Sequence, residues 1–195
     1  MARIFGEIDG HPEGEWFDSR KSLAASGIHP PLQAGICRSP DEGAESIVLS
    51  GGYEDDIDNG DVIVYTGHGG RDPSSGAQIE DQTLDRQNLA LVKNKEFNLP
   101  VRVVRGYEHA SEHSPKTGYR YDGLYEVENY WEAQGKSGFK IYRFRLVKFN
   151  TESPDPRDLG LYRCSVCDKR ILGYETKKHK QEAHPSQRVE WIKLL

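Results

Sequence analysis

Residues 50–70 read SGGYEDDIDNGDVIVYTGHGG and contain both halves of a candidate β-hairpin. The run DVIVYT at 61–66 is rich in β-branched and aromatic residues, which favour strands. The DNG triplet before it is a turn sequence, so Tyr53 is expected to face Tyr65 across the hairpin. Five carboxylates lie within the eight positions Glu54–Asp61. The stretch therefore predicts either a solvated hairpin or a pocket whose ligand needs a carboxylate.

Further strands are expected on both sides of this hairpin, because several short runs are rich in Val, Ile, Tyr and Phe and are bounded by Gly, Asn or Pro. These runs are SIVLS (46–50), PVRVVRG (100–106), YEVENYW (125–131) and FKIYRFRLVK (139–148). Helical spacing of apolar residues predicts one helix over 79–94 and a shorter one over 16–27. Strands dominate, with helices outside, which indicates an α+β fold around a closed or strongly curved sheet such as a barrel.

The composition fits a single good core with a small appendage. The chain has 195 residues, of which 35% are hydrophobic and 29% are charged. Its apolar runs are too short to span a membrane, and no apolar leader with a positive charge begins the chain. The three cysteines, Cys37, Cys164 and Cys167, favour a reducing compartment and a metal over a disulfide framework. We therefore expect a soluble intracellular protein with no membrane partner.

Charge is distributed unevenly along the chain, whose net charge is −5. Residues 136–148 hold five basic side chains and no acidic one, and residues 161–195 hold eight basic against four acidic. The acids crowd instead into the region 41–61. This polarity is typical of a protein with one basic face for nucleic acid, although a solvated strand and a charged tail would give the same pattern.

A change of composition near residue 150 predicts two domains. Residues 1–150 form the large domain, TESPDPRDLG at 151–160 is a linker, and 161–195 form a small module. The module is too short to be held together by core burial alone. Its cysteines and histidines have spacings suited to one tetrahedral, structural zinc ion, with the ligands Cys164, Cys167, His179 and His184. The alternative is an unstructured tail in which these residues coincide.

The acidic hairpin also meets the requirements for binding a cytosine base. The exocyclic amine of cytosine needs an acceptor such as the Asp56 carboxylate. Backbone N–H groups of a glycine-rich segment could donate to its carbonyl. The two faces of the base need aromatic partners, which Tyr53 and Tyr65 would supply at about 1–3 kcal/mol each. Two such rings could offset the few kcal/mol needed to rotate one nucleotide out of a duplex.

Six blocks, in this order, resemble the SRA domain, which is also called the YDG domain. The blocks are FGEIDGHPEGEWF, SGIHPPLQAGI, VLSGGYEDDIDNGDVIVYTGHGGRD, PVRVVRG, YRYDGLYEVENYW and GKSGFKIYRFRL, and they span about residues 3–149. The resemblance implies a PUA-like curved β-barrel with flanking helices. It also implies binding to double-stranded DNA, with a flipped 5-methylcytosine (5-hydroxymethylcytosine in some members) held in a pocket.

The resemblance assigns roles to residues of the hairpin and of a second loop. Tyr53 and Tyr65 would sandwich the flipped base, Asp56 would accept from its amine, and Thr66 would line the ring edge. Backbone at four further positions would contact the base or its phosphate, namely Gly51, Gly52, Gly35 and Ile36. The candidates for contact with the DNA backbone or groove are Gln33, Arg71, Lys136, Lys140 and Arg143.

Two positions depart from the vertebrate members that sense hemimethylated CpG. The finger tip lies close to Gly76-Ala77-Gln78, without the basic reader of those proteins, and the thumb position holds Gln33. We therefore expect recognition of 5-methylcytosine with weak sequence context. The short chain and the appended Cys/His unit resemble bacterial members that belong to modification-dependent restriction systems, which implies a cytoplasmic, nucleoid-associated protein.

The leading hypothesis is a non-enzymatic reader of methylated DNA with a small zinc module. The alternative is an HNH-type endonuclease that cuts near methylated cytosine, because such nucleases often place a C-x2-C ahead of a hairpin ending in an Ala-His pair. His184 would then be the general base. A third hypothesis makes residues 161–195 a docking site for a separate nuclease or another protein.

Overall fold

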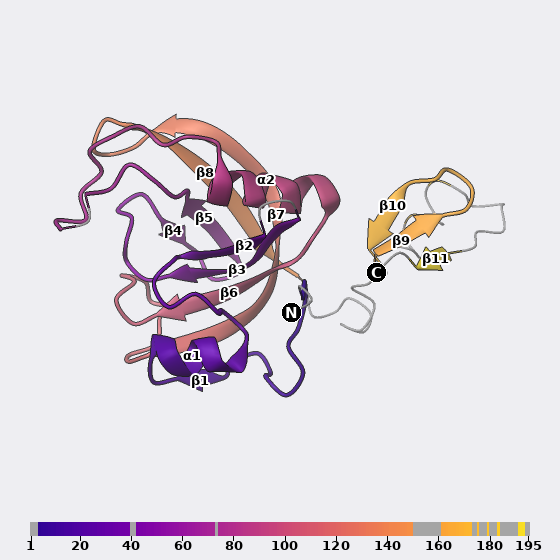
Figure 1. Cartoon of the computed structure of the whole chain (residues 1–195), viewed down its shortest axis with the longest axis horizontal. Helices are drawn as coiled ribbons and strands as arrows, with labels where there is room; N and C mark the ends of the chain where they lie inside the picture. Colours follow the sequence, from indigo (N-terminus) through magenta and orange to yellow (C-terminus); the bar gives the residue numbers. More distant parts are fainter. Residues whose placement is uncertain are drawn as a thin grey trace. The chain divides into compact units, whose positions relative to one another are not determined.

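The computed structural model describes residues 4–39, 42–72, 74–149 and 161–172, with Glu175, His179, Ala183 and residues 191–193. The chain divides into two compact units, Met1–Lys148 and Phe149–Leu195 (Figure 1). The predicted linker at 151–160 lies outside the described residues, as does His184. Each unit is considered by itself below.

One mixed, eight-stranded sheet organises the first unit. Its strands are β1 (Trp16–Phe17), β2 (Ile36–Ser39), β3 (Gly43–Leu49), β4 (Ile57–Asp58), β5 (Val62–Thr66), β6 (Val101–Gly106), β7 (Tyr119–Gln134) and β8 (Lys140–Lys148). The strand order is β2-β3-β6-β7-β8-β5-β4, with β1 paired to β7. The β3–β6 pair is parallel and the other pairs are antiparallel. The long strands β7 and β8 curve across this sheet (Figure 1).

The barrel prediction goes further than the observed pairing. Strands β2 and β4 end the path, and no pair between them closes the sheet among the described residues. The prediction of an α+β fold dominated by strands is confirmed, and all five predicted strands are present. Strands β1 and β2 were not predicted, and β4 was expected only as the first half of the hairpin. Two of them are only two residues long, too short to give a periodic signal.

The two predicted helices are present with different starts. Helix α1 covers Arg20–Ser26, because the Ser19 side chain caps its first turn and leaves the preceding Trp16–Phe17 free to pair with β7. Helix α2 covers Arg86–Phe97. The segment before α2 does not join the helix, since the backbone N–H of Gln82 donates to the carbonyl of Lys140 on β8.

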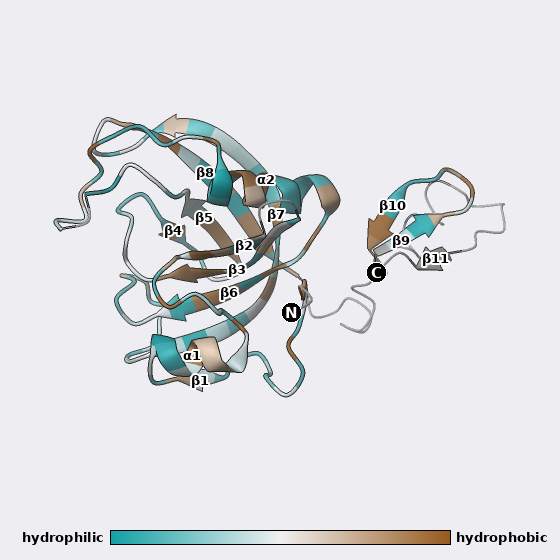
Figure 2. Ribbon diagram, viewed as in Figure 1, coloured by the Kyte–Doolittle hydropathy of each residue, from teal (hydrophilic) through white to brown (hydrophobic). Residues whose placement is uncertain are grey.

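The helices cover opposite faces of strands β3 and β6. On one face Ala90, Leu91 and Val92 of α2 pack in a cluster with Ile47 and Leu49 of β3. On the other, Leu23 of α1 packs with Val48 of β3, Val104 of β6 and Tyr121 of β7. Every residue of β3 is buried, and Figure 2 shows the hydrophobic colour concentrated on these central strands. Burial on both faces makes this part of the sheet a rigid support for the loops at its edge.

The second unit contains a small antiparallel sheet with the order β10-β9-β11. Its strands are β9 (Leu161–Cys164), β10 (Arg170–Leu172) and β11 (Trp191–Lys193). Cys164 ends β9, and a turn that returns to β10 contains Cys167. In neither unit do the described residues include a helix long and apolar enough to cross a membrane.

Candidate functional site

The predicted hairpin is present, with Ile57 paired to Val64 and Asp58 paired to Ile63. Gly60 has a φ of +75° in its turn, a conformation that glycine adopts without strain. This register extends to place Asp56 beside Tyr65. Tyr53 lies before β4 and outside the ladder, so the two tyrosines are not cross-strand partners in it. The loop Tyr53–Asp56 is thus a separate segment that other contacts must hold.

A buried ion pair fixes the turn of this hairpin to the centre of the sheet. Arg105 of β6 donates to both carboxylate oxygens of Asp58, at 2.7 and 2.8 Å, and to the carbonyl of Gly60 at 2.7 Å. The Asp58 side chain is 1% exposed and that of Arg105 is 3% exposed. Burial alone would raise the pKa of the Asp58 carboxyl, but hydrogen bonds from Arg105 and His109 hold it well below its usual range.

The Tyr121-Asp122-Gly123 triplet belongs to the same network. Asp122 of β7 forms an ion pair with Arg105 at 3.1 Å and a second one with Arg120 at 2.6 Å. The triplet therefore supports the hairpin through Arg105. The sequence analysis gave Arg105 no role, although an arginine within a strand of otherwise buried, apolar residues is a signal for a paired internal charge.

Asp56, the predicted acceptor for a base, is held at the end of β5. Its Oδ1 accepts a hydrogen bond of 2.7 Å from the backbone N–H of Thr66. Burial raises the pKa of the Asp56 carboxyl to about 6, against the opposing effects of the Thr66 hydrogen bonds and of the charges on His109 and Arg143. A carboxylate offers about four acceptor positions, so Asp56 keeps acceptor capacity for a ligand beside its bond to Thr66.

Tyr65 and Gly35 approach each other closely. Tyr65 is 3% exposed and packs within the larger core cluster. Burial raises the pKa of its hydroxyl well above the usual value, and the neighbouring Asp56 and Tyr53 add to this effect. A Cβ at Gly35 would lie 2.9 Å from the Tyr65 hydroxyl oxygen, which is too close for any larger residue without a shift. Two predicted site elements, the hairpin and the loop before β2, therefore meet at Tyr65.

Tyr53 stands at the mouth of the site with an arginine over its ring. The guanidinium carbon of Arg71 lies 4.8 Å from the ring centroid, within the range of a cation–π contact. The Arg71 Nε donates to the carbonyl of Gly76 at 2.7 Å, and the Tyr53 hydroxyl accepts from the backbone N–H of Gly69 at 3.2 Å. A Cβ at Gly52 would lie 2.7 Å from an Arg71 nitrogen. The bare backbone at Gly52 thus makes room for this guanidinium.

Two buried amides hold the backbone that follows Thr66. The Gln82 side chain donates to the carbonyl of Gly67 at 2.7 Å and accepts from the backbone of Tyr142 at 2.9 Å. Asn88 of α2 accepts from the backbone of His68 and donates to its carbonyl, at 2.7 and 2.9 Å. Neither amide was predicted as a site residue, because nothing in the spacing of a lone Gln or Asn distinguishes it from a surface residue.

A cavity of about 390 Å³ opens between the loop Tyr53–Asp56, called the acidic loop below, and the finger loop, residues 71–78. It is lined by Gly51, Gly52, Tyr53, Glu54, Asp55, Arg71, Ser75, Gly76, Ala77, Gln78 and Ser137. Tyr65, Asp56 and Thr66 do not line this cavity. The structure thus brings Tyr53 and the two glycines to an open cavity, while Tyr65, Asp56 and Thr66 lie in the more buried region beside it. Figure 1 shows the connection from β5 to α2 projecting from the body of the first unit.

The residues predicted to face DNA differ in their surroundings. Gln33 is exposed. Lys136 and Arg143 both donate to the acidic loop, Lys136 to Glu54 and Asp55 and Arg143 to the carbonyl of Asp55.

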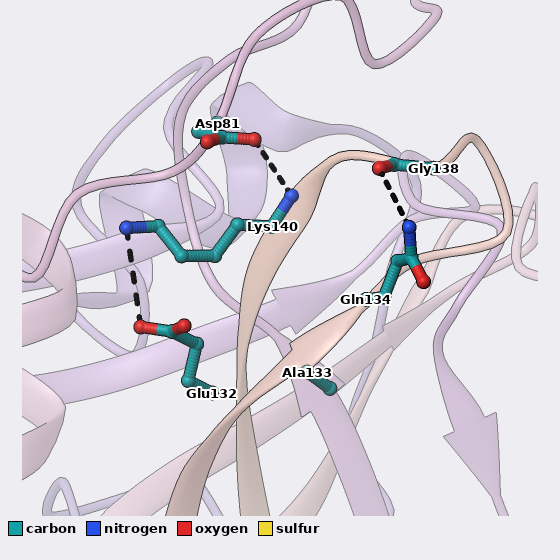
Figure 3. Close-up of a pocket in the computed structure, with 6 residues that line it drawn as sticks. All are labelled: Asp81, Glu132, Ala133, Gln134, Gly138 and Lys140. Carbon is teal, nitrogen blue, oxygen red and sulfur yellow. Dashed lines mark hydrogen bonds and ion pairs between the residues drawn. The ribbon is translucent and has the colours of Figure 1, made fainter.

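Lys140 lies at a second, shallow cavity of about 440 Å³, which Figure 3 shows. There its backbone N–H donates to Asp81 at 2.8 Å, and its ammonium lies 3.9 Å from Glu132. A contact of that length between half-exposed groups is weak, so the Lys140 ammonium is available to another anion.

Three of the four predicted metal ligands lie together in the second unit. The ligand atoms of Cys164, Cys167 and His179 all lie within 4.8 Å of one another, and the Cys167 Sγ is 3.3 Å from the His179 Nε2. Tetrahedral zinc with bonds of about 2.0–2.3 Å needs ligand atoms roughly 3.3–3.8 Å apart, and the Cys167–His179 separation falls in this range. Thiolate and imidazole are donors that zinc prefers, so the cluster is a possible metal-binding group. The fourth predicted ligand, His184, is outside the described residues.

Comparison with known proteins identifies the domain family to which this fold and site belong. The family model of the SAD/SRA domain matches residues 4–152, and the chain belongs to this family. Among curated proteins, the chain is 43% identical over 176 residues to the E3 ubiquitin-protein ligase UHRF1 of Rattus norvegicus, covering 80% of this chain and 22% of that protein. It is 40% identical to the UHRF1-like protein of Cryptococcus neoformans, of which it covers 49%. The chain therefore spans about half or less of these relatives.

Solved structures give the same family with closer coverage. A chain of the modification-dependent TagI restriction endonuclease is 47% identical, with a TM-score of 0.74. The match covers 77% of this chain and 54% of that one. The SUVH5 SRA domain bound to fully hydroxymethylated CG DNA is 41% identical, with a TM-score of 0.65. The match covers 75% of this chain and 95% of that one. The SRA fold is thus confirmed, while the strand pairing of the described residues does not close the sheet into a barrel.

Proposed function

We propose that this chain binds DNA that contains 5-methylcytosine and rotates the modified base out of the duplex into the site at Tyr53, Asp56, Tyr65 and Thr66. The observation that carries the proposal is Asp56, a largely buried carboxyl with one oxygen held by the Thr66 N–H. Membership of the SAD/SRA family supports it, as does similarity to SRA structures bound to methylated and hydroxymethylated DNA.

In the bound state each residue has a distinct task. Tyr53 and Tyr65 stack on the two faces of the base, and Asp56 accepts from its exocyclic amine. Entry of the base requires Tyr65 and Asp56 to become accessible from the cavity that Tyr53 lines, because both are largely buried in the free protein. Backbone at Gly51 and Gly52, and at Gly35 and Ile36, contacts the nucleotide.

The contacts outside the pocket set sequence context. Gln33 and Lys140 meet the DNA backbone or groove, as does Arg71 at the rim of the cavity. The finger loop contributes little base reading, because the Gln78 amide nitrogen is already bonded to the carbonyls of Gly69 and Glu80. Weak sequence context follows, with similar preference for the methyl group in CpG and non-CpG sites.

The test is a comparison of dissociation constants for duplexes with and without one 5-methylcytosine at a single salt concentration. Wild-type protein is expected to bind the methylated duplex more tightly, and Asp56→Ala and Tyr53→Ala to lose most of that preference. Tyr107→Ala is the control, since this exposed tyrosine lies outside the site. Equal affinity of wild-type protein for the two duplexes would overturn the proposal.

A second candidate function is supported by the similarity to the TagI restriction endonuclease and by the Cys/His cluster. In it the chain, as an HNH-type nuclease with His184 as general base, cuts DNA near the methylated cytosine. Incubation of methylated plasmid with Mg²⁺, Mn²⁺ or Co²⁺ distinguishes the two functions. Cleavage that His184→Ala abolishes would establish the enzyme, and intact plasmid under all three metals would favour the reader.

We further propose that the Cys164, Cys167 and His179 cluster holds a structural zinc ion with His184 as fourth ligand. The metal would fix the turn between β9 and β10 and the strand ends next to it, and it would contribute directly to folding of this unit. The unit could also serve as a contact for a separate nuclease, in a bacterial, nucleoid-associated setting. Binding to a candidate nuclease with and without residues 161–195 would test that role.

A further inference from the structure

The acidic loop is attached to the hairpin that joins β7 to β8 by a set of bonds that the proposed function does not use. The Asp55 carboxylate accepts from the backbone N–H of Lys136, at 3.1 and 3.3 Å to its two oxygens. The Lys136 ammonium donates to the carbonyl of Glu54, and the Ser137 hydroxyl donates to the Glu54 carboxylate. A Cβ at Gly135 would lie 2.9 Å from Asp55 Oδ2, so the hairpin backbone fits closely under this carboxylate.

Arg143 adds a bond on the other side of the same loop. Its Nη2 donates to the carbonyl of Asp55 at 2.7 Å, and its guanidinium lies 6.0 Å from the ring centroid of Trp131. Across the β5–β8 ladder, Arg143 is the register partner of Thr66, whose N–H holds the Asp56 carboxylate. Arg143 is therefore bonded to the residue before Asp56 and paired with the residue that Asp56 contacts.

From these bonds we infer that Arg143 and Lys136 are positioning residues for the modified-base pocket, and that Asp55 is their acceptor. They hold the loop Tyr53–Asp56 against β8, which sets where the Tyr53 ring and the Asp56 carboxyl stand. The basic run at 136–148 predicted phosphate contacts for both side chains. Instead the Lys136 ammonium donates to the carbonyl of Glu54, and the Arg143 Nη2 donates to the carbonyl of Asp55. The inference rests on the proposed function, since it concerns the same pocket.

A phosphate contact and a positioning role give different signatures in binding. Loss of one phosphate contact weakens binding to all DNA alike and lowers the slope of log K against log salt by about 1. Loss of a positioning bond leaves that slope in place and lowers the preference for the methylated duplex. Loss of a hydrogen bond between charged and polar groups corresponds to a change of about tenfold.

The experiment measures dissociation constants for methylated and unmethylated duplexes at four salt concentrations. Arg143→Gln is expected to lower the methyl preference about tenfold with an unchanged salt slope, and Arg143→Lys to restore part of it. Arg145→Gln is the matched control. It makes the same change of charge two residues along β8, where Arg145 pairs with Glu128 and not with the acidic loop. Its methyl preference should equal that of the wild type.

Asp55→Ala provides a second test, because the lost charge and the released loop are expected to change DNA binding in opposite directions. Removing a negative charge should strengthen binding to any duplex, whereas release of the loop should lower the methyl preference. Asp61→Ala, at an exposed acid of the same block, is its control. Because Asp55 lies on a surface loop, this variant remains informative if Arg143→Gln fails to fold.

The possible outcomes separate this inference from the proposed function. A wild-type protein without methyl preference overturns the proposed function itself. In the second outcome the wild type prefers the methylated duplex and the variants keep that preference, but Arg143→Gln lowers the slope of log K against log salt. This result overturns the inference alone and makes Arg143 a phosphate contact. Loss of preference in Arg143→Gln and Asp55→Ala, with both controls unchanged, supports the positioning role.

Discussion

Asp55 and Asp56 are adjacent carboxylates with opposite assignments. Asp55 accepts from the hairpin backbone at Lys136, and Asp56 accepts from Thr66 at the end of β5. Burial raises the pKa of the Asp56 carboxyl to about 6. A charge density that looks uniform in the sequence is thus divided between one acid that holds the loop and one that is available to a ligand.

The raised pKa of Asp56 predicts a conflict between binding and stability. The folded state holds the Asp56 proton more tightly than the unfolded chain, so the carboxyl costs stability progressively as pH rises from about 4 to about 6, and fully above that range. Asp56→Asn keeps an oxygen for the Thr66 N–H and removes the buried charge. We expect it to stabilise the protein at pH 7 by about 2 kcal/mol while it abolishes methyl preference.

Urea unfolding at pH 7 and at pH 4 checks this prediction. The gain in the free energy of unfolding should be present at pH 7 and mostly lost at pH 4, because the folded state of the wild type is protonated there and the unfolded state is partly protonated. A destabilised Asp56→Asn protein at pH 7 would contradict it and would mean that the carboxylate has a stabilising partner in the fold.

At the scale of elements, the hairpin β4–β5 is fixed to β6 by Arg105 and only through it to the Asp122 of β7. Substituting one member of a buried ion pair leaves an uncompensated charge, which destabilises the fold by more than the intact pair stabilises it. The hairpin carries Asp56 and Tyr65 side by side at its open end, away from the turn. Its stability therefore decides whether the site exists before DNA arrives.

Asp58→Asn is predicted to destabilise the first unit by about 3–5 kcal/mol, because Arg105 loses its closest countercharge. The effect should be smaller at low pH, since the depressed pKa of Asp58 gives stability that is lost as pH falls through its folded value. Chemical unfolding followed by circular dichroism measures both. Asp61→Asn, three residues away and exposed, should change stability by no more than about 0.5 kcal/mol.

The sequence predicted elements and site residues to different degrees, for physical reasons. Strands such as β5 and β6 have continuous apolar runs, and the hairpin has a turn sequence, so both were recognised. The start of α2 was not, because the bond from Gln82 to Lys140 that keeps its preceding segment extended joins residues far apart in the chain. For the same reason the bonds of Arg143 and Lys136 to the acidic loop could not be read from their charge.

At the scale of the whole molecule, two units of different size rely on different sources of stability. The first has two hydrophobic clusters on the faces of its sheet. The second offers few buried apolar residues among those described, chiefly Ile171 and Leu172. A segment of this size generally needs a metal or disulfides to fold.

Removal of zinc is therefore predicted to unfold the second unit and to leave the first intact. Dialysis against a strong chelator, or Cys164→Ser, should remove hydrogen-exchange protection from the backbone amides of β9 and β10, with the methyl preference of the first unit retained. Cys37→Ser is the control, since this buried cysteine belongs to the first unit. Zinc content near zero in protein purified without chelator would contradict the metal assignment.

The finger loop closes on itself. Gln78, which was expected near the tip, instead forms a bridge with Arg71 at the base. The Asp72 carboxylate accepts from the backbone of Ser74 and Ser75 within the loop. Because the loop is closed by bonds among its own residues, its tip can change without loss of contacts to the rest of the unit. Its tip could be exchanged for one of another length or charge to change which neighbouring bases are read, provided that Arg71 and Gln78 stay to close it.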